Sequence, residues 1–401
     1  MISFLGLLLF IFVAYLISSS RKDIQWRTVL SGLALQLGLG LIVLKSAFGQ
    51  AFFEAARVGF ARVLDYTQEG SSFVFGNLAN YDHVGFVFFT MVLPTIVFMS
   101  ALMSILYHIG IMQILIKIAA KIMVKIMGTS GAESLAAAAN VFAGQTEAPL
   151  VIRPFISKMT RSELMALMTG GMATVAGGVL AAYVGFGIDA GHLLAASVMS
   201  APAALVVAKM MVPETGESVT KGDIKVDLPR ETVNLVDAAA SGAAEGLKLS
   251  FNVGGMLIAF IALIALVNGI LGGLGGLVGF DSLSLELVFG VLFFPVAFMM
   301  GVPIDDCLAV GNLLGQKLIL NEFVAYMGLQ QVMGEISERA VIISTYALCG
   351  FANFASIAIQ VGGIGSLAPD RRKDLALLGV KSLIGGTLAC LMTASIAGML
   401  L

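Results

Sequence analysis

The stretch Gly144-Gln145-Thr146-Glu147-Ala148-Pro149 decides the fold of this chain, because it places an amide, a hydroxyl, a carboxylate and a helix breaker inside a long apolar region. Ionisable groups at membrane depth cost several kcal/mol and usually mark a substrate or ion pathway. The chain carries a second polar set, formed by Asn321-Glu322 and by Phe351-Ala352-Asn353-Phe354-Ala355-Ser356. Two such sites in one apolar chain predict a membrane transporter.

The composition also predicts a polytopic membrane protein. Of the 401 residues, 58% are hydrophobic and only 12% are charged, whereas about a quarter of the residues in a soluble domain are charged. The net charge of −2 indicates no nucleic-acid partner. The three cysteines and three histidines are scattered without metal-ligand spacing, so we expect them to be structural.

Apolar segments of about 20 residues, long enough to cross a bilayer, recur along the chain. We expect eight spans, at about 2–18, 28–46, 84–107, 163–185, 190–212, 248–272, 338–362 and 376–400. The first segment lacks the basic region and the cleavage pattern of a signal peptide. Because Arg21, Lys22 and Arg27 follow it, we predict a cytoplasmic loop there and an N-terminus outside, with a bacterial inner membrane as the natural host.

Two regions have amphipathic sequences. Residues 50–80 are more polar, and we expect them at the outer surface. Residues 112–127 are apolar except for one glutamine and three lysines, and the i, i+4, i+8 spacing of Lys117, Lys121 and Lys125 places the charges on one stripe of a helix. We predict that this helix lies in the cytoplasmic interface with its lysines among headgroups; a calmodulin-type target helix is the alternative.

Two further apolar regions are interrupted, and each half is too short to span a membrane. Residues 133–158 are broken at 144–149, and residues 282–320 are broken at 300–306. We interpret both as re-entrant helical hairpins with tips near mid-membrane, where non-helical backbone needs cover from protein or a water-filled cavity.

The arrangement around the hairpins occurs twice. Each hairpin is followed by a span with an interruption, at 174–178 and at 350–356, and then by an uninterrupted span. This is the internal-repeat pattern of secondary transporters that bind substrate at the repeat interface. One intervening span makes the repeats inverted, and we interpret the charged loop 212–238 as a solvated linker between them.

The polar residues of the two sites suit a neutral solute with many hydrogen-bond donors and acceptors, such as a sugar. Each set supplies a carboxylate, an amide and a hydroxyl. They are Gln145, Thr146 and Glu147 in the first set and Glu322, Asn353 and Ser356 in the second. Structural alternatives stay open, because Asn353 and Ser356 can bond between helices, and the glutamates can pair with Arg153 or Lys317.

A further constellation surrounds Asn140. Its side-chain carbonyl and the Thr174 hydroxyl, with the freed backbone carbonyls of Ala143 and Val175, would form a hard-oxygen site without formal charge. Such a site suits sodium better than a divalent ion, which normally requires carboxylates. Alternatively, Asn140 merely ties the hairpin to its neighbour.

At these residues the chain resembles the concentrative nucleoside transporter family, and the resemblance covers essentially the whole chain in order. The segments that carry it are Gly144–Leu150, Asn321–Tyr326, Gly350–Ile359, Gly365–Pro369 and Arg371-Arg372. It implies an all-α homotrimer in a lipid bilayer, each protomer having eight transmembrane helices, two re-entrant hairpins and an interfacial helix. It also implies inverted repeats and an elevator mechanism. The implied domains are a scaffold at 1–128, a first transport repeat at 129–212, a linker and scaffold span at 213–275, and a second transport repeat at 276–401.

The resemblance assigns each candidate residue a role. The nucleobase would lie at Gln145, Thr146, Glu147 and Val179, and the ribose at Glu322, Asn353 and Ser356, with Phe351 packing nearby and Leu257 closing the pocket. Sodium would bind at Asn140, Ala143, Thr174 and Val175. In bacterial sodium-coupled members we expect a serine at the position of Thr174 and a larger residue at that of Ala143. Proton-coupled relatives tend to lack the asparagine, so Asn140 favours sodium.

We therefore expect a sodium-coupled symporter that imports nucleosides such as uridine, with Na+ as the coupling ion. The alternatives are a proton-coupled nucleoside symporter, a passive channel, and an intramembrane enzyme with Glu147 or Glu322 as general base. The enzyme lacks an evident nucleophile–base pair or metal cluster, and neither an enzyme nor a channel explains the repeated plan as well.

Overall fold

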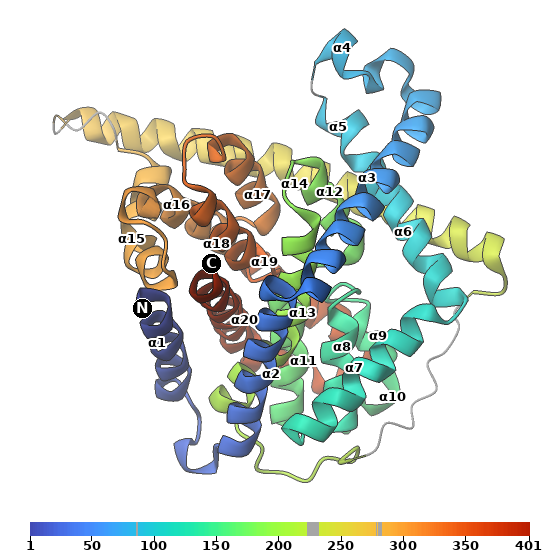
Figure 1. Ribbon diagram of the computed structural model, residues 1–401, viewed down its shortest axis with the longest axis vertical. Helices are drawn as coiled ribbons and strands as arrows, with labels where there is room; N and C mark the ends of the chain where they lie inside the picture. The colour runs from blue at the N-terminus through green and yellow to red at the C-terminus, as the bar shows by residue number, and fades with distance from the viewer. Residues whose placement is uncertain (86, 223–231, 278, 280–282) are drawn as a thin grey trace.

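The computed structural model describes residues 1–85, 87–222, 232–277, 279 and 283–401, and every regular element in them is helical (Figure 1). The α-helices are α1 (Ile2–Leu16), α2 (Trp26–Lys45), α3 (Ala47–Phe75), α4 (Tyr81–Val84), α5 (Phe88–Met91), α6 (Leu93–His108), α7 (Ile111–Met127), α8 (Gly131–Asn140), α9 (Ala148–Val151), α10 (Arg153–Ile156), α11 (Arg161–Ala173), α12 (Gly177–Gly185), α13 (Ala190–Met211), α14 (Leu235–Leu277), α15 (Leu285–Met300), α16 (Cys307–Ile319), α17 (Glu322–Val332), α18 (Glu338–Leu348), α19 (Phe354–Leu367) and α20 (Arg372–Leu400). Short 3-10 helices lie at Arg21–Asp23, Gly76–Ala79, Ile304–Asp306 and Pro369–Arg371.

The predicted spans overlap α1, α2, α5–α6, α11–α12, α13, α14, α18–α19 and α20. Within the described residues, six helical segments are long and apolar enough to cross a membrane: Trp26–Lys45, Phe88–His108, Arg161–Gly185, Ala190–Met211, Leu235–Leu277 and Pro369–Leu400. The shorter α1, α15 and α19 are also apolar. The charged linker between the repeats includes residues 223–231, which lie outside the described part of the chain.

Helix α14 is much longer than the span expected at 248–272. It contains 43 residues, which corresponds to about 65 Å at 1.5 Å per residue, and it runs across the whole width of the molecule in Figure 1. Glycines explain how it packs closely on α6. A Cβ on Gly242 would lie 2.6 Å from the Ser100 carbonyl oxygen, and one on Gly246 would lie 2.7 Å from Val97 Cα.

The helices follow a similar order in two parts of the chain. In the first unit α7 packs on α8, and the broken helix α11–α12 precedes α13; in the second, α15 packs on α16, and α18–α19 precedes α20. Helices α13 and α20 pack on each other, with α2 against α13 and α1 against α20. The two N-terminal helices thus flank corresponding helices of the two units.

The second hairpin differs from its prediction, because its cavity-facing tip is not at 300–306. Residues 301–306 do connect the antiparallel helices α15 and α16, but this turn lies beside the α17–α18 turn, where Ser337 Oγ donates to Asp306 Oδ2 at 2.5 Å. The tip near the cavity is Leu320–Asn321, between α16 and α17. Asn321 caps α17 by accepting from Val324 N at 2.9 Å, which is a helix-start signal inside the predicted hairpin. Ser282, its predicted first residue, lies outside the described chain.

The first hairpin opens earlier than predicted, because α8 already ends at Asn140 and α9 starts at Ala148. Residues 141–147 therefore form the non-helical tip, whereas the sequence predicted a break only at 144–149. The backbone near Asn140 and Gln145, where the sequence places its ion and substrate candidates, is largely buried but not helical.

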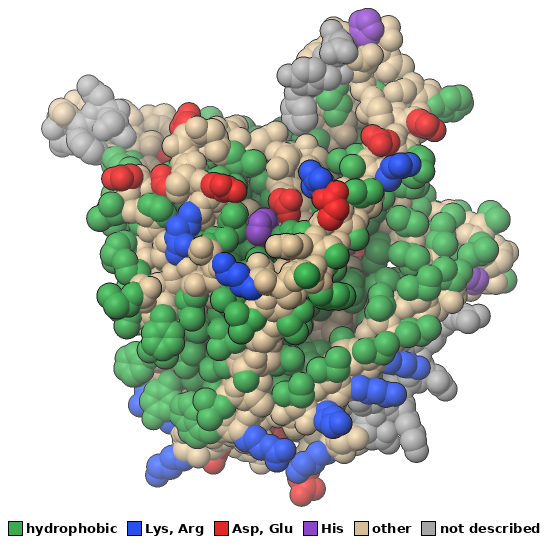
Figure 2. Space-filling model, viewed as in Figure 1, with side chains coloured by type: hydrophobic (Ala, Val, Ile, Leu, Met, Phe, Trp, Pro, Cys, Tyr) green, Lys and Arg blue, Asp and Glu red, His purple; other side chains and the backbone are tan. Residues whose placement is uncertain are grey.

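Helix α7 is amphipathic, as expected from the sequence. Met112, Ile116 and Met123 are buried on one side, while isoleucines are exposed on another and Lys121 and Lys125 are exposed between them. Basic side chains gather along the end of the molecule that carries α7, and most visible acidic side chains lie toward the opposite end (Figure 2). The polar region expected at 50–80 is mostly α3, a largely exposed helix that projects from the body in Figure 1.

Candidate functional site

A cavity of about 160 Å³ lies where the two hairpin tips, the two helix breaks and α14 meet. All nine substrate-site candidates line it: Gln145, Thr146, Glu147, Val179, Leu257, Glu322, Phe351, Asn353 and Ser356. The other lining residues are Gly144, Ala176, Leu249, Val253, Met256, Asn321, Phe323, Ala355 and Ile359. The fold therefore brings the two polar sets together, although they are far apart in sequence.

The second polar set is assembled at two helix starts. Asn321 caps α17, whose first residue is Glu322, and Asn353 caps α19 by accepting from Ser356 N at 2.9 Å. Helix N-termini favour negative charge and hydrogen-bond acceptors. Both asparagines thus position a cavity group, the carboxylate of Glu322 in one case and the hydroxyl of Ser356 in the other.

The Glu322 carboxylate is held by neutral donors. Asn353 Nδ2 donates to Oε2 at 3.0 Å, and the Tyr183 hydroxyl donates to Oε1 at 3.3 Å. Among the described residues no basic group lies within 4 Å of it. Lys317, considered as a partner from the sequence, instead donates to the Ala347 carbonyl at 2.8 Å. The carboxylate can therefore still accept hydrogen bonds from a ligand.

The first polar set is held mainly through Gln145. Its Nε2 donates to Ser356 Oγ at 3.0 Å, which links the two sets, and its Oε1 accepts from Gln360 Nε2 at 3.0 Å. Gln360 also donates to the Met168 carbonyl. Glu147 accepts from Gly144 N at 2.7 Å, within its own tip. Thr146 and Glu147 are exposed to the cavity side, while Gln145 is buried.

The two helix breaks touch each other behind the cavity. Phe351 N donates to the Thr174 carbonyl at 3.2 Å, and Gly177 N donates to the carbonyl of Phe142 in the first hairpin tip at 2.9 Å. Gly350 is required there, because its φ is +155° and a Cβ would lie 2.8 Å from the Met172 carbonyl oxygen. These bonds fix the breaks relative to each other and to the first hairpin.

Asn140 is a buried amide, 1% exposed, whose polar atoms Oδ1 and Nδ2 are both left without a hydrogen-bond partner. Thr174 is also buried, and its hydroxyl donates to the Gly170 carbonyl at 2.9 Å, so its oxygen still has lone pairs to offer. Buried amides are nearly always partnered. The neutral oxygen donors fit sodium, and no cluster of three or more His, Cys, Asp or Glu suited to a metal occurs in the described chain.

Tyr183 and Gln360 are two functional candidates that the sequence reasoning missed. Gln360 lies four residues after Ser356 and seven after Asn353, so all three share one helix face. That spacing would have been enough to predict Gln360 as a site residue from the sequence. Tyr183 lies four residues after Val179, but its contact with Glu322 on another helix depends on the tertiary fold.

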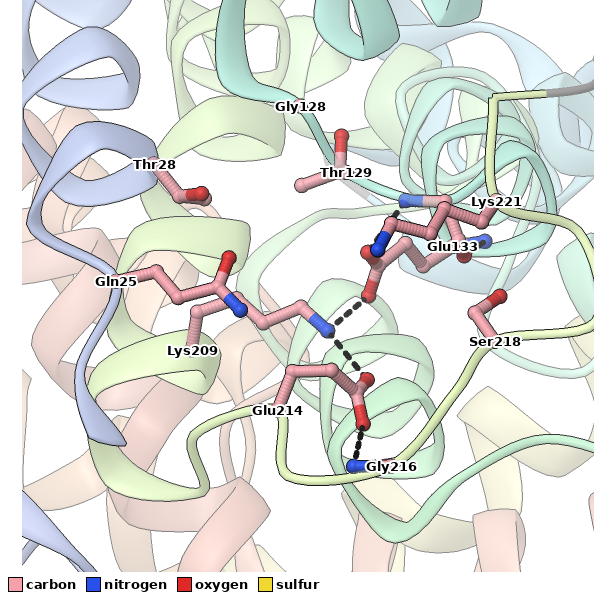
Figure 3. A pocket seen from close by; sticks show the side chains of 11 residues that line it. Gln25, Thr28, Gly128, Thr129, Glu133, Lys209, Glu214, Gly216, Ser218 and Lys221 are labelled. Carbon is pink, nitrogen blue, oxygen red and sulfur yellow. Dashed lines mark hydrogen bonds and ion pairs between the residues drawn. The ribbon is translucent and has the colours of Figure 1, made fainter.

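A second polar pocket, of about 100 Å³, lies away from these residues (Figure 3). Lys209 pairs there with Glu133 at 2.6 Å and with Glu214 at 3.2 Å. Glu163 accepts from Ser130 Oγ and Ser218 Oγ, both at 2.6 Å. The carboxylates are thus already engaged, and the cluster holds the segment after α13 against the starts of α8 and α11.

Comparisons with known proteins agree with this architecture. Residues 5–78 and 192–398 match the N- and C-terminal parts of the family described as Na+ dependent nucleoside transporter, and residues 89–190 match one described as Nucleoside recognition. The uncharacterized transporter YutK of Bacillus subtilis is 48% identical, over 98% of both chains. Mouse sodium/nucleoside cotransporter 1 is 44% identical over all of this chain, which spans 64% of the mouse protein.

Solved structures show the same fold. The structure described as CNTnw in an inward-facing substrate-bound state is 45% identical, with a TM-score of 0.94, and the match covers 100% of this chain and 97% of that one. The architecture and the paired polar sites are those of a polytopic membrane transporter. The chain belongs to the concentrative, sodium-dependent nucleoside transporter family; it is a transporter, not an enzyme, and Na+ is its coupling ion.

Proposed function

We propose that this protein imports nucleosides such as uridine together with sodium, by an elevator mechanism, and that the cavity between the hairpin tips binds the substrate. The observation that carries the proposal is the convergence of two carboxylate–amide–hydroxyl sets on one cavity. Each set is suited to one half of a nucleoside, since the ribose and the base both present donors and acceptors in fixed positions.

We assign the ribose to the second set. Glu322 is oriented by two neutral donors and keeps acceptor capacity, so it can accept from two vicinal hydroxyls, with Asn353 and Ser356 beside it. Phe351 supplies an apolar face. The base then lies against Gln145, Thr146, Glu147 and Val179, and Leu257 of α14 closes the cavity.

The sodium site is proposed at Asn140, Ala143, Thr174 and Val175. A cation there would satisfy the Asn140 carbonyl and join the first hairpin tip to the break in α11–α12. Ion binding would fix the segment that carries Gln145, so sodium and nucleoside should tighten each other's binding by the same factor. At about 100 mV, one sodium ion contributes about 2.3 kcal/mol, enough for roughly fortyfold accumulation.

The packing supports a division into scaffold and moving parts that differs from the sequence boundaries. We assign α6 and α14 to the scaffold, because they pack closely on each other, while α3 packs on α6 and also on α2 and α13 and so connects the two parts. Helices α1 and α2 pack on α20 and α13, so we place them with the transport repeats rather than in a scaffold at 1–128. The cavity then lies at the boundary, since Leu249, Val253, Met256 and Leu257 of α14 form one wall.

We further propose that both hairpins are re-entrant, that the repeats are inverted, and that the scaffold holds a homotrimer in a bacterial inner membrane. The large exposed apolar residues of α14, including Ile258, Leu266 and Leu277, would face lipid or neighbouring protomers. The basic end of the molecule, with α7, would be cytoplasmic, which places the N-terminus outside.

The test is uptake of radiolabelled uridine into proteoliposomes under an imposed sodium gradient or an imposed proton gradient. We expect accumulation with sodium. Accumulation with protons alone would replace the sodium site by the proton-coupled alternative. Equilibration without accumulation under either gradient would favour a passive channel.

A further inference from the structure

A polar contact outside the cavity joins α14 to the start of the second hairpin. Asn268 Nδ2 donates to both carboxylate oxygens of Glu286, at 3.0 and 2.9 Å, and Asn268 Oδ1 accepts from Leu285 N at 2.8 Å. One amide thus holds the first two residues of α15. We call this set of three hydrogen bonds the α14–α15 clasp.

The clasp accounts for a polar residue in a strongly apolar segment. From 253 to 277 every residue of α14 except Asn268 has an apolar side chain or none. An amide in apolar surroundings is costly unless it is hydrogen-bonded, and polar residues in membrane helices often bond to another helix. Among the described residues no basic group lies within 4 Å of Glu286, so the Asn268 amide holds the carboxylate without an ion pair.

Chain continuity does not impose the clasp. Asn268 lies nine residues before Leu277, the end of α14, which corresponds to about 13 Å along the helix axis. Leu285 follows Leu277 by eight residues, a length of chain that can reach more than about 20 Å when extended. The start of α15 therefore has many places within reach, and the three hydrogen bonds select one of them.

The clasp joins two parts that the proposed mechanism moves relative to each other. Helix α14 packs on α6, whereas α15 packs mainly on α16 and α1 and also on α20. Leu257, the last cavity residue of α14, lies 11 residues before Asn268, about 16 Å along the helix. The clasp thus belongs to the boundary between the parts and lies apart from the substrate cavity.

We propose that the clasp is a latch between the scaffold and the moving unit: it holds the second hairpin in the conformation of this structure and opens each time the unit crosses the membrane. This inference rests on the elevator mechanism proposed above. Asn268 and Glu286 are only half-buried, so other polar groups can reach them when the latch opens. Glu286 also lies in the first turn of α15, where the helix dipole favours its charge without Asn268.

The test closes the latch with a disulfide. Asn268→Cys/Glu286→Cys keeps the three native cysteines, all of which are buried, and sodium-driven uridine uptake into proteoliposomes is measured before and after oxidation with copper phenanthroline. We expect uptake to fall at least tenfold on cross-linking and to return after reduction, while the cross-linked protein still binds uridine. Undiminished uptake by the fully cross-linked protein would overturn the latch.

Two further cysteine pairs separate the latch from the mechanism. Ser157→Cys/Asp370→Cys replaces a 3.0 Å contact within the moving unit, so its oxidation should leave uptake unchanged; an equal loss in both pairs would overturn the latch. Ser100→Cys/Gly178→Cys joins α6 to α12 elsewhere on the boundary, where a Cβ on Gly178 would lie 3.0 Å from Ser100 Oγ. If oxidation stops uptake there but not at the clasp, the elevator mechanism stands and the latch is overturned. If oxidation stops uptake at neither pair, the elevator mechanism is overturned as well.

Asn268→Leu opens the latch without a cross-link, and it keeps the proposal testable if the cysteine pair does not fold. The variant removes all three hydrogen bonds, so the balance between conformations shifts. We expect the uridine KM or the maximal rate to change at least threefold at a fixed sodium gradient, with an unchanged elution profile. Asn268→Gln, which keeps an amide, should lie nearer to the unmodified protein. A KM and a maximal rate that both stay the same in Asn268→Leu would contradict the proposal.

Discussion

The two hairpin tips have the same topological place but are built differently. The second tip is short, Leu320–Asn321, and its carboxylate is held by Asn353 and Tyr183 from other helices. The first is a seven-residue non-helical segment, from 141 to 147, between α8 and α9. Its carboxylate, on Glu147, bonds only the backbone of its own tip among the contacts described, and the Asn140 amide beside it has no partner.

This difference indicates that the two halves of the cavity have different roles. The second half is preorganised, so a ligand pays little to order it. The first half has unsatisfied groups and long non-helical backbone, so its order should depend on what binds. Coupling between ion and substrate is therefore expected in the first half, and most of the fixed recognition in the second.

The largest effect should follow a change in the preorganised half. Glu322→Gln removes the negative charge and replaces one acceptor oxygen by a donor, so two proposed charge-assisted hydrogen bonds to the ribose would be weakened or lost, each contributing about 1.5 kcal/mol or more. We expect uridine affinity and uptake to fall by about a hundredfold, with an unchanged elution profile of the purified protein. Glu335→Gln, at the exposed far end of the same hairpin, is the control. Normal uridine uptake by Glu322→Gln would contradict the ribose assignment.

The next largest effect tests the ion-dependent half. Asn140→Ala removes an amide that makes no hydrogen bond within the protein, so its effect would report on the proposed ion site. We expect the sodium concentration for half-maximal uptake to rise about tenfold, as for the loss of about 1.4 kcal/mol of ligand interaction. Asn312→Ala, on the equivalent helix α16, serves as the comparison. Sodium dependence equal to that of the unmodified protein would remove Asn140 from the ion site.

A smaller effect tests how firmly the second half is held. Tyr183→Phe keeps the ring but removes the donor to Glu322, a contact of about 1 kcal/mol. We expect uridine binding to weaken about fivefold, measured by calorimetry, with sodium dependence unchanged. Tyr346→Phe, whose hydroxyl lies near His192, controls for the loss of a buried hydroxyl. An equal loss in both variants would show a general packing effect rather than a role in the cavity.

The smallest effect concerns the link between the halves. Gln360→Leu leaves Gln145 without the donor that orients its amide, so we expect the uridine KM to rise about threefold while the maximal rate and the sodium response stay the same. Gln316→Leu, on α16, is the matched control. A change in maximal rate with an unchanged KM would instead indicate a role in the motion of the repeats.

Much of the site was predictable because its chemistry is unusual for a membrane. Glu147, Glu322 and Asn353 are conspicuous in apolar segments, and all of them line the cavity. Gln360 was recoverable from its helical spacing. Tyr183 was not, because an apolar aromatic segment gives no sign that one hydroxyl meets a distant carboxylate.

The fold can be predicted from the sequence where hydropathy or turn residues change sharply, and not where they do not. Hydropathy could not limit α14, since its apolar residues continue well past the length of one span. The 300–306 turn contains a glycine, a proline and two aspartates and was mistaken for the second tip. The real tip is marked only by the helix cap at Asn321. Glycine, proline and aspartate thus predict the turn at 300–306 from the sequence, but no such residues mark the short tip at Leu320–Asn321.

The unpartnered amide of Asn140 has a consequence for the stability of the protein as well as for transport. A buried polar group without a partner costs about 1–3 kcal/mol, and the Asn140 amide at the base of the first hairpin is such a group. A ligand that binds only the folded state stabilises it by mass action. Sodium would then raise the thermal unfolding temperature, and a cell depleted of sodium would hold this transporter closer to denaturation and proteolysis.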